Sequence, residues 1–210
     1  MILKQIVKKV YSVYIHQRYK NISKTAFIFP GNKIGVPNNL IMGKNSTLNT
    51  ASAIQNLRAK FIMGNNSGAA RELMVITGNH MSIVGMNLKQ VTDKVKDQYD
   101  TKKEMDKDVV VEDDVWIGSR VTLLSGVHIG RGCEIGSGSV VRHSTPPYSI
   151  VVGNPAKVIC FRFTPEEIVE HEKVQYPEEE RLPLDLLHRN YEKYYLSKIK
   201  EIRKYLSITF

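Results

Sequence analysis

Residues 111–145 read VEDDVWIGSRVTLLSGVHIGRGCEIGSGSVVRHST and repeat with a period of six residues. One position of each repeat is aliphatic: Val111, Ile117, Leu123, Ile129, Ile135 and Val141. The fifth residue of each repeat is compact: Val115, Val121, Val127, Cys133, Ser139 and Thr145. A helix would return its apolar face every 3.6 residues and a strand every two, so this period indicates three short flat sides stacked turn upon turn. The stretch therefore predicts a parallel β-helix of hexapeptide repeats.

The same pattern predicts how each coil is filled. The aliphatic residues point into the prism, and the compact residues fill the corners beside them. Glycine follows three of the aliphatics, at Gly118, Gly130 and Gly136, where the backbone turns and a Cβ would collide. Because one coil cannot bury its own inner face, stability must come from stacked neighbours.

The period persists only in fragments along residues 25–85. One phase holds Ile28, Ile34 and Leu40, and another holds Met42, Leu48 and Ile54. Such phase slips indicate coils with small insertions. From 86 to 108 the period vanishes and charged residues dominate, which favours a polar loop extruded between two coils. A disordered excursion is the alternative interpretation of this composition.

Residues 1–24 contain six Lys and Arg and no acidic residue. Ile2, Ile6, Val10 and Val13 would share one face of a helix. This helix either rests on an anionic membrane surface or packs on its own β-helix with a solvated polar face, and we expect the second. Lysines interrupt the apolar run and no small-residue cleavage site follows, so a signal peptide is not predicted. The run is also too short to span a bilayer.

The repeats end at PPYSIVVGNPAKV, because prolines cannot donate to a sheet ladder. Thr164, Pro165 and Glu167 then supply the cap, first-turn proline and capping-box partner of a helix. Helical spacing predicts a second helix over 184–206. The expected organisation is an N-terminal helical extension over 1–24, a β-helix over 25–163 and a C-terminal helical extension over 164–210.

Composition narrows the function classes. A hydrophobic fraction of 42% suffices for a core. The formal net charge of +9 invites a nucleic-acid interpretation, but no recognition motif accompanies it, so no nucleic-acid partner is expected. GRGCEIG has the wrong spacing for a dinucleotide fingerprint, and GKNST lacks the Ser or Thr that must directly follow the lysine of a P-loop. Cys133 and Cys160 do not suggest a disulfide framework, so a cytoplasmic location is expected.

The run DDVWIGSRVTLLSGVHIGRGCEIGSGSVV, preceded by TGNHMSIVG and closed by YSIVVGNPAKVI and FRFTPEEI, resembles the hexapeptide-repeat acyltransferases. Within them it is most similar to the branch that holds maltose and galactoside O-acetyltransferases, xenobiotic acetyltransferases, and the O-acetyltransferases of capsule and O-antigen synthesis. The match spans about residues 25–165.

The resemblance implies a left-handed coil and a homotrimer whose active sites lie between neighbouring chains, with acetyl-CoA in the cleft. His80, in Thr77-Gly78-Asn79-His80, matches the family's catalytic histidine. An imidazole is suited to taking the proton of a sugar hydroxyl near neutral pH. The hydroxyl would then attack the thioester directly. We expect Cys133 to be buried, which argues against a covalent acyl-enzyme.

The residues expected to contact acetyl-CoA are Trp116, Ser119, Ser137, Arg142, Lys157 and Arg162. Ser119 and Ser137 match positions, one coil apart, that line the pantetheine arm in relatives, and Trp116 would form part of the cleft wall. The three cations suit the phosphates by charge. For each of them, solvated surface is the alternative. Relatives often carry Thr-Lys where this chain has Arg142 and His143.

The resulting expectation is a metal-independent, acetyl-CoA-dependent O-acetyltransferase that acts on a sugar or polysaccharide precursor. A xenobiotic acceptor such as chloramphenicol or a streptogramin is the alternative within enzymes. A non-catalytic β-helix scaffold is the alternative outside them. A zinc-dependent hydratase would need converging histidines, and His80 and His128 are separated by the loop.

Overall fold

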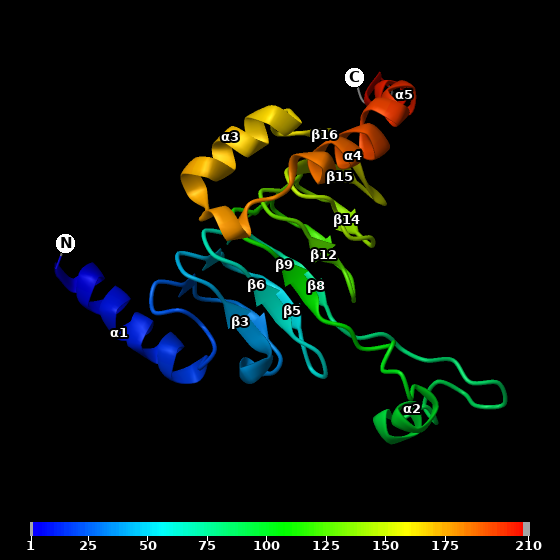
Figure 1. Ribbon diagram of the computed structural model, residues 1–210. Helices are drawn as coiled ribbons and strands as arrows, with labels where there is room; N and C mark the ends of the chain where they lie inside the picture. Colours follow the sequence, from blue (N-terminus) through cyan, green and yellow to red (C-terminus); the bar gives the residue numbers. More distant parts are fainter. Residues whose placement is uncertain (1, 208–210) are drawn as a thin grey trace.

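The computed structural model describes residues 2–207, with side chains from Lys9 to Leu206, and its centre is a three-sided column of short strands (Figure 1). Successive strands enter different parallel sheets, so each circuit of the chain adds one rung to every side. The first sheet contains β1 (Phe27–Ile28), β4 (Thr47–Leu48), β7 (Gly68–Ala69), β10 (Trp116–Ile117), β13 (Glu134–Ile135), β15 (Ser149–Gly153) and the antiparallel β16 (Ala156–Phe161). The second contains β2 (Lys33–Ile34), β5 (Ala53–Gln55), β8 (Met74–Ile76), β11 (Thr122–Leu123) and β14 (Val140–Val141). The third contains β3 (Leu40–Met42), β6 (Phe61–Met63), β9 (Val109–Val111) and β12 (His128–Ile129).

The six-residue period sets the register of the later coils. Ile117 pairs with Ile135 and Leu123 pairs with Val141, so three hexapeptides make one circuit. All six repeat aliphatics are at most 1% exposed, and the compact corner residues are buried beside them. The predicted parallel β-helix core is therefore confirmed.

The role of the repeat glycines differs from the prediction. Gly118, Gly130 and Gly136 do not adopt a left-handed backbone, whereas Asp114 and Arg120 do, with φ of 57° and 59°. A Cβ at Gly130 would lie 2.6 Å from the backbone nitrogen of Pro147 in the next coil. These glycines are thus required by the close stacking of coils and not by the turn.

The phase slips near the N-terminus are insertions, as predicted. Leu40 and Met42 both lie in β3, and both side chains are buried. They pair with the equally buried Phe61 and Met63 of the next rung. The extra residues before β3 form a 3-10 turn, η1 (Pro37–Asn39). Insertions at the corners therefore leave the stacking of the strands intact.

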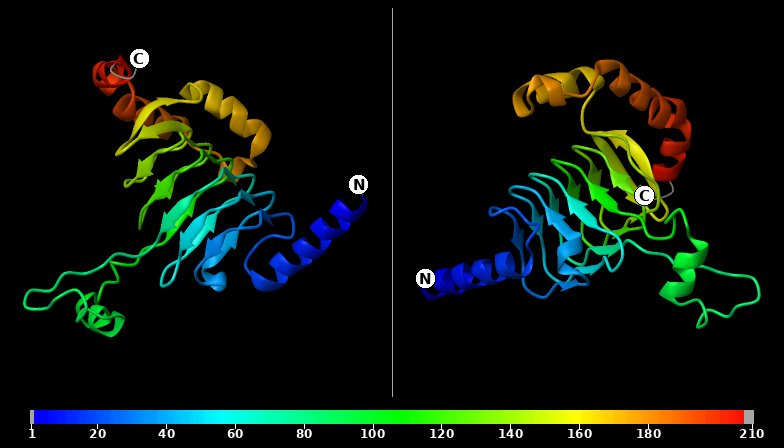
Figure 2. Two further views of the ribbon diagram at one scale, coloured as in Figure 1. Left: turned by 180° about the vertical axis from the view of Figure 1, so that it is seen from behind. Right: turned by 60° about the horizontal axis from the view of Figure 1, so that its bottom comes forward.

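A long segment leaves the column between β8 and β9 (Figures 1 and 2). It spans residues 77–108, which is longer than the predicted loop over 86–108. It also contains a helix that the pattern did not predict, α2 (Asp93–Tyr99), whose cap is Thr92. Seven residues are too few to show an apolar period, which explains why this helix was missed.

The N-terminal helix α1 (Ile2–Arg18) ends before the predicted limit of residue 24. It packs on the first coil through Tyr11, Ile15 and Tyr19. The helix packs on the β-helix as expected, but Val10 and Val13 of the predicted apolar face are 64% and 53% exposed. The side chains of Ile2 and Ile6, which complete that face, lie outside the described residues. At Val10 and Val13 the predicted face is therefore wrong, because the side of the helix that carries Ile15 makes the contact.

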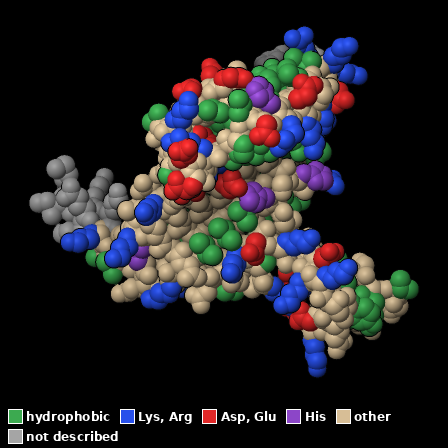
Figure 3. Space-filling model, in the orientation of Figure 1, with side chains coloured by type: hydrophobic (Ala, Val, Ile, Leu, Met, Phe, Trp, Pro, Cys, Tyr) green, Lys and Arg blue, Asp and Glu red, His purple; other side chains and the backbone are tan. Residues whose placement is uncertain are grey.

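The C-terminal extension forms a helical layer over the last coils: α3 (Pro165–Gln175), a 3-10 turn η2 (Glu178–Glu180), α4 (Leu184–Tyr194), a 3-10 turn η3 (Leu196–Lys198) and α5 (Ile199–Ser207). The capping box of Thr164 and Glu167 is present as predicted. The single helix predicted over 184–206 is broken at Tyr195. There the Ser197 hydroxyl donates to the Lys193 carbonyl at 2.9 Å, which competes with the helical ladder. Acidic and basic side chains are interspersed over this layer (Figure 3).

Candidate active site

The predicted base, His80, follows the point where β8 leaves the column. Thr77, which is 1% exposed, donates its hydroxyl to the carbonyls of Gln55 and Ala59 at 3.1 and 3.3 Å. Its own carbonyl accepts from the Lys107 amide and the Ser125 hydroxyl, each at 2.9 Å. Thr77 therefore fixes the outgoing strand to the returning one at the root of the inserted segment.

The next two residues continue this pairing. Gly78 forms an antiparallel bridge with Asp106, and the Asn79 amide donates to the Met105 carbonyl at 2.9 Å. A Cβ at Gly78 would lie 2.6 Å from an oxygen of the Asp106 side chain. The backbone that leads into His80 is consequently held on both sides.

An ion cluster around the buried Lys96 ties α2 to the same turn. Lys96 is 7% exposed, and its Nζ donates to Asp106 Oδ1 at 2.6 Å and to the Asn79 carbonyl at 2.7 Å. Arg58 Nε contacts the other carboxylate oxygen of Asp106 at 2.8 Å and also pairs with Asp97 of α2. A buried charge is stable only beside a partner, so Lys96 must stay in contact with Asp106. The cluster therefore holds the inserted segment in one position on the column.

His80 itself is exposed at a pocket of about 440 Å³ that this cluster borders. The pocket lies between the β5–β6 connection, the end of β8 and the start of α2, and Leu57, Met81 and Thr92 are among the residues that line it. Within the described side chains, His80 forms no hydrogen bond. Its imidazole is therefore available to a ligand hydroxyl that enters the pocket.

Trp116 lies on a different face of the column, in the first sheet. It is 56% exposed, and its ring covers Gly68, where a Cβ would approach it to 3.2 Å. Arg162 lines the same shallow pocket, but its NH1 contacts Asp114 Oδ2 at 2.9 Å and its Nε lies 3.4 Å from Glu134. Since two carboxylates already balance Arg162, the arrangement favours a structural role over phosphate binding.

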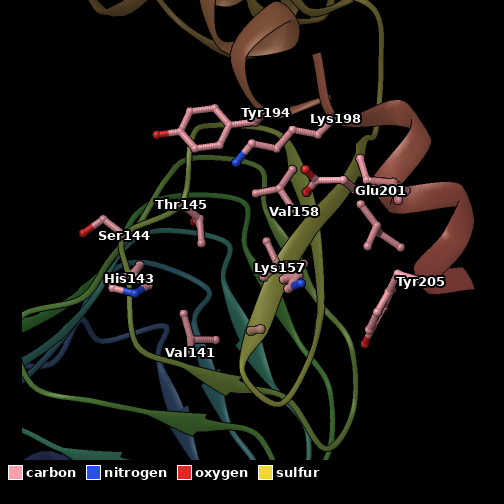
Figure 4. A pocket seen from close by; sticks show the side chains of 14 residues that line it. Val141, His143, Ser144, Thr145, Lys157, Val158, Tyr194, Lys198, Glu201 and Tyr205 are labelled. Carbon is pink, nitrogen blue, oxygen red and sulfur yellow. The ribbon is translucent and has the colours of Figure 1, made fainter. Parts of the chain in front are cut away.

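Ser119 and Ser137 lie at the corner that follows this face. They are one coil apart, and the Ser119 amide donates to the Ser137 hydroxyl at 3.1 Å. Arg142 is exposed after β14. Lys157 lies in a pocket of about 410 Å³ between the last coil and α5, with its Nζ 5.7 Å from the Tyr205 ring centre (Figure 4).

The structure therefore does not bring all the predicted residues together in one chain. His80 has its own pocket, Trp116 and Arg162 share a second, and Lys157 lines a third. The sequence pattern did not predict the contact of Arg58 and Lys96 with Asp106 beside His80. No sequence signal relates Arg58 to residues 38 or 48 positions later, because only the extruded segment brings them into contact.

The remaining candidate groups have structural partners. His128 Nε2 contacts Glu112 at 2.5 Å on the outer surface. Cys133 is buried among Thr145, Ser149 and the Pro146 carbonyl, and burial raises the pKa of its thiol. Among the described residues, no three His, Cys, Asp or Glu side chains converge as a metal site.

Comparisons with known proteins agree with this architecture. The family model "Bacterial transferase hexapeptide (six repeats)" matches residues 108–143. A maltose O-acetyltransferase of Clostridium difficile 630 superposes with a TM-score of 0.58 at 26% identity, over 69% of this chain and 70% of its own. The chain is thus similar to the hexapeptide-repeat acetyltransferases. The repeat and the parallel sheets fit the left-handed β-helix of this family.

Two further relatives show how much of the chain aligns with known acetyltransferases. A probable macrolide acetyltransferase of Lysinibacillus sphaericus is 40% identical over 109 residues, which are 52% of this chain and 56% of that protein. The aligned part thus spans about half the length of this relative. A hexapeptide-repeat acetyltransferase of Vibrio cholerae, solved with acetyl coenzyme A, shares the fold with a TM-score of 0.55 at 20% identity, over 73% of this chain and 77% of its own.

Proposed function

We propose that this hexapeptide-repeat protein transfers an acetyl group from acetyl-CoA to a hydroxyl of a sugar or polysaccharide precursor, with His80 as general base. The observation that carries the proposal is the exposed, unpartnered His80 imidazole at the pocket beneath the inserted segment. The acetyltransferase relatives support the reaction class.

The chemistry follows from this position. A hydroxyl that donates a hydrogen bond to the imidazole loses its proton as its oxygen attacks the thioester carbonyl. The carbon–sulfur bond then breaks, and the imidazolium returns the proton to the departing thiolate. The buried Cys133, whose thiol pKa is raised, is unsuited to carry the acetyl group, so transfer is direct.

Acetyl-CoA would bind on the face of the column that carries Trp116. Trp116 offers an exposed ring, and the Ser119–Ser137 corner offers hydroxyls for an extended pantetheine arm. Arg142 and Lys157, near the last coil, carry charges that suit phosphate groups. Arg162, already paired with carboxylates, would support the Trp116 wall.

Because His80 and Trp116 occupy different pockets of one chain, the proposal includes assembly of copies side by side. In a homotrimer, His80 of one copy would face acetyl-CoA held against Trp116 of its neighbour. Cyclic assemblies repeat one contact around an axis and therefore create identical shared sites. Cys133 and Cys160 are free thiols, which suits a reducing cytoplasm.

An antibiotic acceptor is the second candidate. It is favoured by the similarity to the probable macrolide acetyltransferase. Both candidates use the same donor and base, and they differ only in what enters the pocket beside His80.

The test is thiol release from acetyl-CoA in the presence of mono- and oligosaccharides, chloramphenicol, a macrolide and a streptogramin. We expect sugar-dependent release that falls by about 10² to 10⁴ in His80→Ala, the range for a lost general base. His188→Ala, which changes an exposed histidine of α4, is the matched control.

Release with the antibiotics alone would replace the sugar by a xenobiotic acceptor. Absence of both release and acetyl-CoA binding would contradict the enzyme and favour a scaffold. Equal rates in wild type and His80→Ala would remove His80 from the reaction.

A further inference from the structure

Helix α1 carries two apolar faces, and only one of them is covered. Ile15 and Tyr19 are 1% and 7% exposed where they pack on the first coil. Val10 and Val13 lie about 140° and 160° around the helix from Ile15, on its far side. They are 64% and 53% exposed, and Tyr14 is 51% exposed beside them. Apolar side chains on the outer side of a terminal helix call for a partner.

Charge is distributed very unevenly along the chain. The first 71 residues contain eleven Lys and Arg and no Asp or Glu, since the first acidic residue is Glu72. The rest of the chain holds nineteen basic and twenty-one acidic residues. The whole excess of positive charge therefore belongs to α1 and the first coils. The charged side chains visible over these elements are Lys and Arg (Figure 3).

The cations lie next to the exposed apolar residues. Val13, Lys20 and Lys24 line one surface hollow of about 370 Å³. Lys9 is exposed next to Val10. Among the described side chains, neither Lys9, Lys20 nor Lys24 pairs with a carboxylate. We call Lys9, Val10, Val13, Tyr14, Lys20 and Lys24 the N-terminal face.

An aromatic row continues from this face onto the first coil. The ring centres of Tyr14 and Tyr11 are 6.1 Å apart, those of Tyr11 and Phe27 are 6.2 Å apart, and those of Phe27 and Phe29 are 4.9 Å apart. Phe29 at the end of the row is 38% exposed. Aromatic rings at the border of an apolar patch are typical of surfaces that meet the headgroup region of a bilayer.

We propose that the N-terminal face docks on the surface of an anionic lipid bilayer. Exposed apolar side chains beside cations, without any carboxylate, match the acyl boundary and the charged headgroups of such a surface. The contact is peripheral, because no helix among the described residues is long and apolar enough to cross a membrane.

Two other occupants fit less well. A soluble polyanion would use the lysines but would leave Val10, Val13 and Tyr14 in water. A second copy that presents the same face would bring two acid-free surfaces together, and like charges repel. Contact with the C-terminal layer of another copy would be head-to-tail and would build further rings or filaments beyond the side-by-side trimer.

Co-sedimentation of the full chain with vesicles tests the proposal. We expect binding to phosphatidylcholine vesicles that contain 30% phosphatidylglycerol, and no binding to pure phosphatidylcholine. Lys20→Gln/Lys24→Gln should weaken binding about 30-fold, from about fivefold per cation at an anionic surface. Val10→Ser/Val13→Ser should weaken it about tenfold or more through lost apolar burial. Lys193→Gln/Lys200→Gln, which removes two exposed lysines of α4 and α5, is the charge-matched control and should bind as wild type.

Circular dichroism and thiol-release activity of each variant establish that it is folded, because the N-terminal face lies outside the proposed active site. Equal binding to both vesicle types, or equal loss in the control variant, would overturn the proposal. Tighter binding to heparin than to the vesicles, unchanged in Val10→Ser/Val13→Ser, would assign the face to a soluble polyanion instead. Assemblies larger than the trimer in sedimentation velocity that Val10→Ser/Val13→Ser dissolves would assign it to a second copy.

Discussion

At the residue scale, single side chains decide whether coils stack and whether His80 is held in place. The repeat glycines admit the next coil at distances that a Cβ would block. Lys96 reaches from α2 to the carbonyl directly before His80 and to Asp106. The glycines thus control the packing of the column, and Lys96 controls the turn that carries the proposed base.

Gly130→Ala should destabilise the fold. The added Cβ would lie 2.6 Å from Pro147 N and 2.9 Å from the Thr145 carbonyl oxygen, and both are backbone atoms that cannot move aside cheaply. We expect a loss of about 1–3 kcal/mol in the free energy of unfolding, as for other overpacked cores. Urea unfolding measures it. Gly68→Ala is the control, because an added Cβ there would meet only the exposed Trp116 ring, at 3.2 and 3.3 Å, and equal losses in both variants would contradict this explanation.

Lys96→Met should lower kcat while leaving the KM for acetyl-CoA unchanged. The variant keeps the apolar stem but loses the bonds to Asn79 and Asp106, so the turn before His80 loosens. A misplaced base costs on the order of 10- to 100-fold. Lys94→Met, on the exposed side of α2, is the control. A full kcat in Lys96→Met, accompanied only by lower stability, would make Lys96 purely structural.

At the element scale, the C-terminal layer is attached through a buried polar network. Glu172 of α3 is 1% exposed, accepts from the Tyr148 hydroxyl at 3.0 Å and lies 3.3 Å from Arg131. The Arg131 guanidinium also covers the Tyr176 ring at 3.9 Å from its centre. These groups connect α3 and the segment after it to the last coils, so the layer should unfold together with the column.

This network makes stability fall at high pH. Burial raises the pKa of Tyr176 to about 12, although Arg131 opposes the shift. The folded state then holds the Tyr176 proton up to a higher pH than the unfolded chain, whose tyrosines have a pKa of about 10. The stabilisation is complete below about pH 10 and disappears as the pH rises toward 12. Urea midpoints at pH 9 and pH 11.5 should therefore differ less in Tyr176→Phe than in wild type.

Tyr99→Phe in the inserted segment is the control for this pH series, because Tyr99 is exposed. An equal fall in wild type and Tyr176→Phe would exclude Tyr176 as the source.

Some elements could be predicted from the sequence and others could not. The column was predictable because burial recurs every six residues over six repeats, and the α3 cap was predictable from Thr164 and Glu167 alone. The helix α2, the break at Tyr195 and the packed face of α1 were not. The helix α2 is too short to show an apolar period, the break at Tyr195 follows a single local hydrogen bond from Ser197, and the packed face of α1 depends on the tertiary contact of Ile15 with the first coil.

At the scale of the whole molecule, the candidate site is divided. His80 could be predicted from the TGNH run, but its distance from the other candidates could not, since only the folded column shows that His80 and Trp116 have separate pockets. The proposed function consequently requires neighbouring copies, and the N-terminal face with its excess charge is left for a different partner.

A site in which His80 of one copy works on acetyl-CoA held by Trp116 of another is tested most directly by mixing two inactive variants. His80→Ala and Trp116→Ala would be unfolded together, refolded together and assayed for thiol release with an acceptor that wild type uses. In a randomly mixed ring, about a quarter of the shared sites would combine an intact His80 with an intact Trp116. The mixture should regain about that share of wild-type activity, while each variant refolded alone stays inactive. A mixture as inactive as its components would contradict a site shared between copies.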